Sequence, residues 1–145
     1  MRRKATAKWN GTGLEGKGVI TTPSSVLNGT PYNFTARFKD EEGKSATNPE
    51  ELIAAAHAGC FSMALSFQLV GAGFTAEELT TDAVVSFDQV EGGFAITGIT
   101  LKLTGKVPGI SEEKFMELAN AAKVGCPISK ALSAVPITLE AKLVK

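Results

Sequence analysis

The chain has 145 residues, which suits one domain built around a single hydrophobic core. Hydrophobic residues make up 43% of it and charged residues 21%, as is ordinary for a globular protein. Lys plus Arg and Asp plus Glu each number 15, so no overall field favours nucleic acid or an acidic membrane surface. No apolar signal segment follows the basic start, and two cysteines are too few for a secreted disulfide framework. We therefore expect one domain over residues 1–145 and a cytoplasmic location.

The N-terminal part predicts three strands, over residues 4–9, 18–22 and 32–38. These segments are alternating or β-branched, and glycine-containing turns separate them. Residues 11–16 match the dinucleotide-binding fingerprint by letter. That fingerprint requires a following helix, whereas a β-branched run follows here, so we interpret 11–16 as a loop between strands.

A long helix is predicted next. Asn48 is a good N-cap, Pro49 suits the first helical position, Glu51 stands where a capping-box carboxylate belongs, and residues 71–73 end the helix. Residues 52–74 carry no Asp, Glu, Lys or Arg and are long enough to span a bilayer.

The composition of this segment nevertheless favours a buried central helix over a membrane span. It is rich in Ala, Gly and Ser, and it contains His57 and Gln68. A charge-free helix needs cover on every side, which one small domain does not readily supply. Its small residues would let another backbone approach closely, so we expect the helix to pack partly against its own copy in a homodimer.

The C-terminal half predicts a hairpin, two helices and a last strand. Ser111 is the N-cap expected for the first of these helices, and Pro127 opens the second. The order βββ-α-ββ-α-α-β defines an α+β fold class with a long central buried helix. The expected ranges are strands 79–90 and 94–107, joined at 91–93, helices 112–123 and 127–132, and strand 137–144.

Two cysteines, Cys60 and Cys126, carry the strongest chemical signal. Cys60 lies in the long apolar helix, and Cys126 lies between the two shorter helices. They suggest a redox pair in which one thiol takes an oxygen atom from a peroxide and the other closes a disulfide. The residues alone leave the two roles open, because Cys126 lies near a helix N-terminus, where the dipole favours a thiolate. A lone cysteine can also be a small buried hydrophobe.

A thiolate in apolar surroundings needs a positive partner to lower its pKa. Arg37, in an otherwise aromatic segment, is the candidate, and Glu50 could orient its guanidinium. Glu50 is ten positions before Cys60, or about 15 Å along a helix, so it cannot touch Cys60 of its own chain. If Glu50 belongs to the site, it arrives from a second copy. Alternatively, Glu50 complements the helix dipole and Arg37 lies on a solvated strand face.

His57 lies three residues before Cys60, on the same helix face. It could act as a base for the thiol, or join both cysteines and a carboxylate around zinc. The chain has only this one His and no CxxC, so the metal reading is weak. We interpret His57 as a partly buried histidine with satisfied hydrogen bonds.

Two segments resemble the signature motifs of the OsmC/Ohr family of hydroperoxide reductases. The first is Asn48-Pro49-Glu50-x-Leu52, followed by an Ala-rich helix and Cys60-Phe61. The second is Gly125-Cys126-Pro127-Ile128-Ser129. Residues 31–38 and 61–66 are similar to the OsmC branch rather than the Ohr branch. The resemblance runs over nearly the whole chain.

The resemblance implies an OsmC-like fold and an intertwined homodimer with two sites at the subunit interface. It also implies roles that the residues alone leave open: Cys60 peroxidatic, Cys126 resolving, and the motif glutamate and arginine at Glu50 and Arg37. Position 57 varies between His and aromatic residues in such proteins, which agrees with a structural His57.

The expected activity is thiol-dependent reduction of organic hydroperoxides, and more weakly of hydrogen peroxide, without metal, haem or flavin. By resemblance, the reductant is an external dithiol of the lipoyl type, and neither nucleic acid nor a membrane is a partner. The apolar residues expected to favour organic substrates are Phe61, Met63, Phe67, Ile128 and Leu132. Two alternatives are a thiol redox sensor that signals through a partner, and a module that binds an apolar ligand with inert cysteines.

Overall fold

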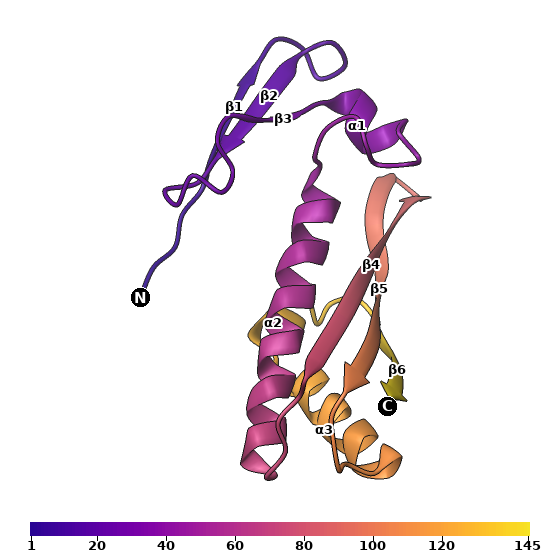
Figure 1. Cartoon of the computed structure of the whole chain (residues 1–145). Helices are drawn as coiled ribbons and strands as arrows, with labels where there is room; N and C mark the ends of the chain where they lie inside the picture. Colours follow the sequence, from indigo (N-terminus) through magenta and orange to yellow (C-terminus); the bar gives the residue numbers. More distant parts are fainter. The chain divides into compact units, whose positions relative to one another are not determined.

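The computed structural model describes all residues, 1–145, and they divide into two compact units, 1–52 and 53–145. Helix α2, Pro49–Gly71, contains the boundary between them. Figure 1 shows the course of the chain through these elements. The expectation of one domain stays a prediction.

The first unit holds a three-stranded antiparallel sheet of order β1-β2-β3 and a short helix, α1. The chain from 11 to 16 is the connection between β1 and β2, as predicted. Strand β1 is exposed along its whole length, so this small sheet buries little within one chain. The bounds are β1 Thr6–Asn10, β2 Lys17–Thr21, β3 Thr30–Tyr32 and α1 Phe34–Phe38.

The prediction of a strand over 32–38 is wrong beyond its first residue, because helix α1 follows β3 directly. The Asn33 side chain caps the helix by accepting a hydrogen bond from the Ala36 amide at 2.8 Å. One helical turn then brings the rings of Phe34 and Phe38 to a centroid distance of 4.8 Å. Aromatic residues four positions apart fit a helix as well as a strand, and the asparagine cap decides between them. The observed element order therefore contains one helix more than predicted.

The predicted start of α2 is confirmed in its main feature. The Asn48 side chain accepts a hydrogen bond from the Glu51 amide at 2.8 Å, and Pro49 is the first helical residue. The Glu51 carboxylate, however, accepts a hydrogen bond from the Thr47 hydroxyl at 2.9 Å, where a capping box would use the backbone amide of the cap residue.

The second unit contains a three-stranded sheet of order β4-β5-β6. Strands β4 and β5 form the predicted antiparallel hairpin, and β6 lies parallel to β5. A parallel neighbour requires a crossover connection, which α3 and α4 supply. The bounds are β4 Glu78–Val90, β5 Gly93–Lys106, α3 Glu112–Gly125, α4 Pro127–Ala131 and β6 Ile137–Val144, in agreement with the sequence to within two residues.

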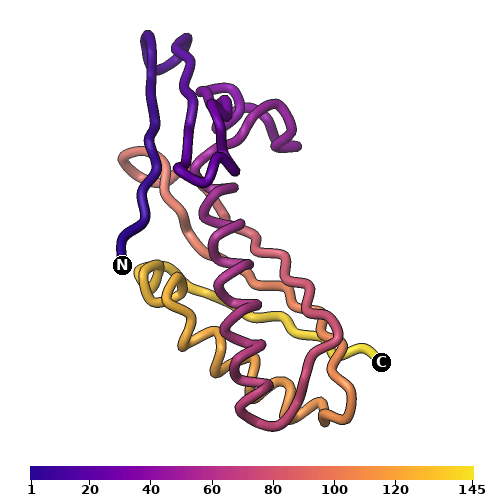
Figure 2. The backbone as a smooth tube through the Cα atoms, turned by 60° about the vertical axis from the view of Figure 1, so that its left-hand side comes forward, coloured from indigo at the N-terminus to yellow at the C-terminus, as the bar shows by residue number.

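The core of the second unit lies between the sheet and the two longer helices. Residues of α2 and α3 share one hydrophobic cluster with the inward face of β5, and Figures 1 and 2 show both helices beside that sheet. The α2 stripe in this cluster consists of Phe61, Leu65 and Leu69, all fully buried. Four-residue spacing is typical of one helix face.

The opposite side of α2 is not covered within one chain. Met63, Phe67 and Val70 are 64%, 72% and 64% exposed. By length and composition α2 could cross a membrane, but its buried stripe is typical of the core helix of a globular protein. One chain thus covers only part of a helix that is apolar all round.

Two glycines of β5 give a matched test of this packing. A Cβ at Gly105 would lie 2.7 Å from Cε2 of the fully buried Phe115 ring, which has no room to move. A Cβ at Gly98 would meet only the Pro136 carbonyl, at 3.6 Å. We expect Gly105→Ala to lower the free energy of unfolding by about 1–3 kcal/mol and Gly98→Ala to change it by less than about 1 kcal/mol in urea titrations. Equal effects would contradict the packing described.

Candidate active site

The two cysteines lie side by side in the second unit. Cys60 is on α2, and Cys126 is the residue between α3 and α4. Their sulfur atoms share a hydrogen bond at 2.8 Å, although 66 positions separate the residues, and both thiols are free. Cys126 is fully buried, whereas Cys60 is partly exposed. The structure therefore places the two thiols close enough to form one disulfide after a small movement.

The surroundings of the two thiols push their pKa values in opposite directions. Burial, and next the hydrogen bond with Cys126, raise the pKa of Cys60, while the Ile128 amide acts the other way. Burial also acts to raise the pKa of Cys126, but hydrogen bonds from Cys60, from the amide and hydroxyl of Ser129 and from Ile128 outweigh it, so that this pKa is lowered. No positive side chain contributes to either shift. A Cys60 thiolate therefore needs a cation that these neighbours do not supply.

Arg37 and Glu50 form the second predicted pair, in the first unit. The Arg37 guanidinium donates from Nη2 to Glu50 Oε1 at 2.9 Å and from Nε to both carboxylate oxygens at 3.3 and 3.4 Å. Glu50 is only 8% exposed. A buried carboxylate is stable as an ion only with such a partner, and the fork geometry fixes the guanidinium plane. The predicted pairing of these residues is observed, although Arg37 comes from helix α1 and not from a strand.

The four predicted site residues thus form two pairs, one in each unit. The first pair consists of two free thiols in contact. In the second pair, Arg37 is a cation oriented by Glu50, and it borders a small cavity of about 140 Å³ that Trp9, Tyr32 and Phe34 also line. The catalytic roles of the four side chains remain predictions.

His57 differs from its predicted state. The side chain is fully buried, its Nε2 and the Ser129 hydroxyl share a hydrogen bond at 2.7 Å, and its Nδ1 has no hydrogen-bond partner. Burial lowers the pKa of His57, so the ring is neutral at pH 7. The prediction of satisfied hydrogen bonds is therefore correct for only one ring nitrogen. Ser129 was not recognised from the sequence, where only its place in the second cysteine motif pointed to it.

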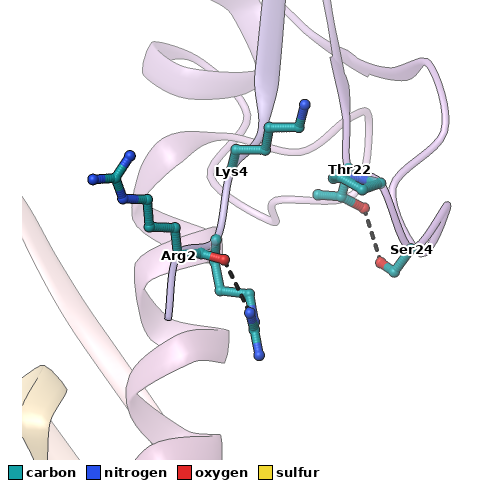
Figure 3. A pocket seen from close by; sticks show the side chains of 6 residues that line it. Arg2, Lys4, Thr22 and Ser24 are labelled. Atoms are coloured by element: carbon teal, nitrogen blue, oxygen red, sulfur yellow. Dashed lines mark hydrogen bonds between the residues drawn. The ribbon is translucent and has the colours of Figure 1, made fainter.

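A large cavity in the first unit is lined by no thiol. It has a volume of about 660 Å³, and Figure 3 shows the side chains of Arg2 and Lys4 extending in different directions around it. The Arg3 guanidinium donates to the Arg2 carbonyl at 2.9 Å. These cations do not converge on one point, and no group of three or more His, Cys, Asp or Glu side chains in the chain could hold a metal ion.

Comparison with known proteins adds independent findings. A family model described as "OsmC-like protein" matches residues 41–140. Peroxiredoxin OsmC of Escherichia coli (strain K12) is 51% identical over 143 residues, which cover 99% of this chain and 97% of that protein. The organic hydroperoxide resistance protein OhrB of Bacillus subtilis (strain 168) is 35% identical over 127 residues, 86% of this chain and 89% of the relative.

Solved structures agree with the fold. The crystal structure of OhrB of Bacillus subtilis matches with a TM-score of 0.70 and 31% identity, covering 96% of this chain and 98% of that one. An OsmC-like protein from Mycoplasma pneumoniae matches with a TM-score of 0.77 over 100% of this chain and 99% of its own. Because its sequence identity is only 17%, this second match supports the fold and no statement about function. The predicted α+β fold class is confirmed.

Proposed function

This chain belongs to the OsmC-like protein family, and on that premise we propose that it is a thiol-dependent peroxidase with Cys60 and Cys126 as its redox pair. The observation that carries the proposal is the 2.8 Å approach of the two free sulfur atoms. The names of the relatives, a peroxiredoxin and an organic hydroperoxide resistance protein, point to the same class of reaction.

Cys60 is the thiol that meets the peroxide, because it is partly exposed whereas Cys126 is fully buried. The Cys60 thiolate attacks the distal oxygen of ROOH, the O–O bond breaks, and the leaving alkoxide takes a proton and departs as ROH. Cys60 becomes a sulfenic acid. Cys126 then attacks its sulfur, the S–O bond breaks, and water leaves as the disulfide forms. An external dithiol returns both electrons by exchange.

Arg37 is the cation proposed to stabilise the Cys60 thiolate, and Glu50 holds its guanidinium. The neighbours of Cys60 within its own unit raise the pKa of its thiol, so the reaction at neutral pH needs an added positive charge. The ion pair with the buried Glu50 fixes the orientation of the Arg37 guanidinium.

We propose that Arg37 of one chain meets Cys60 of a second copy in a homodimer. A single chain leaves the apolar α2 face of Met63, Phe67 and Val70 exposed, and all of β1 as well. Ten positions of α2 separate Glu50 from Cys60, about 15 Å of helical rise, which supports the proposal that the Arg37–Glu50 pair acting on Cys60 belongs to another chain. Two α2 helices crossing antiparallel near Ala55 would bring each ion pair to the other chain's thiol.

The proposed substrate is an organic hydroperoxide, with hydrogen peroxide reduced more weakly. Ile128 and Leu132 are partly buried against the core, and Met63 and Phe67 are exposed on the same helix as Cys60. Phe61 is fully buried in the core and therefore does not line the approach. The proposed reductant is a lipoyl-type dithiol, and the proposed location is the cytoplasm.

Steady-state turnover tests the function. With excess dihydrolipoamide, cumene hydroperoxide should be reduced faster than hydrogen peroxide. Cys60→Ser should lower kcat/KM on the order of a thousandfold, because the nucleophile is gone. Cys126→Ser should still make one Cys60 sulfenic acid per chain, detected by dimedone labelling. Stoichiometric oxidation without turnover would instead indicate a thiol sensor, and equal activity of the Cys60→Ser protein would contradict the proposal.

Subunit complementation tests the shared site. Arg37→Ala and Cys60→Ser proteins are each expected to be nearly inactive. Refolded together, they should regain about a quarter of the wild-type activity, because half of the dimers are mixed and each holds one intact site. Cys60→Ser refolded with Cys126→Ser is the control, since both thiols of a site belong to one chain, and no activity should return. Equal results from the two mixtures would place Arg37 and Cys60 of one site in the same chain.

A further inference from the structure

The hydrogen bond between His57 and Ser129 lies one step away from the thiol pair. His57 is three residues before Cys60 on α2, and Ser129 is three residues after Cys126 in α4. The same two segments are therefore joined twice, by the His57–Ser129 bond at 2.7 Å and by the sulfur contact at 2.8 Å. All four side chains belong to the second unit.

We propose that His57 is a positioning residue which, through the Ser129 hydroxyl, prepares Cys126 for its attack on oxidised Cys60. The inference rests on the proposed function for the reaction it serves. It gives a role to two buried polar residues, His57 and Ser129, that take no part in the proposed peroxidase steps.

The direction of the His57–Ser129 hydrogen bond follows from burial. The ring is neutral, so a single ring nitrogen carries a proton. With the proton on Nε2, His57 donates to the Ser129 oxygen, and the partnerless Nδ1 is a bare acceptor. With the proton on Nδ1, a buried N–H would lack any acceptor, which is the rarer situation in proteins. The Nε2–H form is therefore favoured, and it leaves the Ser129 proton free for another acceptor.

Cys126 is that acceptor. The Ser129 hydroxyl and amide both lower the pKa of the Cys126 thiol, against the effect of its burial. The groups that set this pKa are Cys60 on α2 and Ile128 and Ser129 on α4, none of them a charged side chain. If His57 took the Ser129 proton instead, Cys126 would lose one hydrogen bond that stabilises its thiolate.

The step served is the closing of the disulfide. The Cys126 thiolate attacks the sulfur of the Cys60 sulfenic acid, the new S–S bond forms, and the S–O bond breaks. The hydroxide that leaves becomes water with the proton that the Cys126 thiol gave up. The formal oxidation state of the Cys126 sulfur rises by one and that of the Cys60 sulfur falls by one, so no further reactant is required. The rate of this step follows the thiolate fraction of Cys126.

Cys60→Ser protein isolates the effect on Cys126, because it has a single thiol and needs no peroxide. Thiolate absorbance against pH should show the pKa of Cys126 rising by several tenths to about one unit on Ser129→Ala and on His57→Leu. Ser129→Thr keeps the hydroxyl and His57→Gln keeps a side-chain N–H donor, so both should stay near the parent value. Unchanged pKa values in Ser129→Ala and His57→Leu would overturn the inference and leave the pair as a structural link between α2 and α4.

Protein that keeps both cysteines tests the effect on the rate of disulfide closure. Ser129→Ala and His57→Leu should slow disulfide closure about threefold to tenfold at neutral pH, so that dimedone labels more Cys60 sulfenic acid than in wild type. Closure at the wild-type rate in Ser129→Ala, which is the milder variant, would overturn the inference. A Cys60 that does not react with peroxide at all would count against the proposed function, and the pKa measurement would still decide the role of His57.

Discussion

The packing of one face of α2 against β5 and α3 is the constraint on which the site depends. The buried stripe of Phe61, Leu65 and Leu69 fixes the rotation of the helix about its axis. Cys60, next to Phe61, is thereby held against the end of α3, where Cys126 lies. A rotation of the helix by one residue, about 100°, would carry Cys60 away from its partner. The core contacts that fix the rotation of α2 therefore also fix the position of Cys60 relative to Cys126.

The same helix is the reason for the proposal that one chain holds only part of the site. Its second apolar face and strand β1 remain exposed, and the thiol at its centre has a raised pKa. At its start, the buried Glu50 side chain is paired with Arg37. A homodimer would cover the exposed face and bring the oriented cation to the thiol. The proposed interface would therefore both bury the exposed apolar face of α2 and supply the positive charge proposed for the Cys60 thiolate.

The sequence predicted the parts of the fold whose signals are local and repeated. The hairpin of β4 and β5, the capped starts of α2 and α3, and β6 all follow from periodicity and capping residues. Helix α1 was missed because its aromatic spacing suits a strand as well. The hydrogen bond between His57 and Ser129 joins positions 72 residues apart, and no local pattern encodes such a contact. The relation between the two thiols was likewise open until tertiary packing defined it.

Free-thiol counting after one equivalent of cumene hydroperoxide tests the central claim most directly. The reduced protein has two thiols per chain, and the account predicts that both disappear into a disulfide between Cys60 and Cys126 of the same chain. The product should run as a single chain on a non-reducing gel, and Cys60→Ser protein should keep its remaining thiol. Two surviving thiols in the wild type, or a disulfide that links separate chains, would contradict the account.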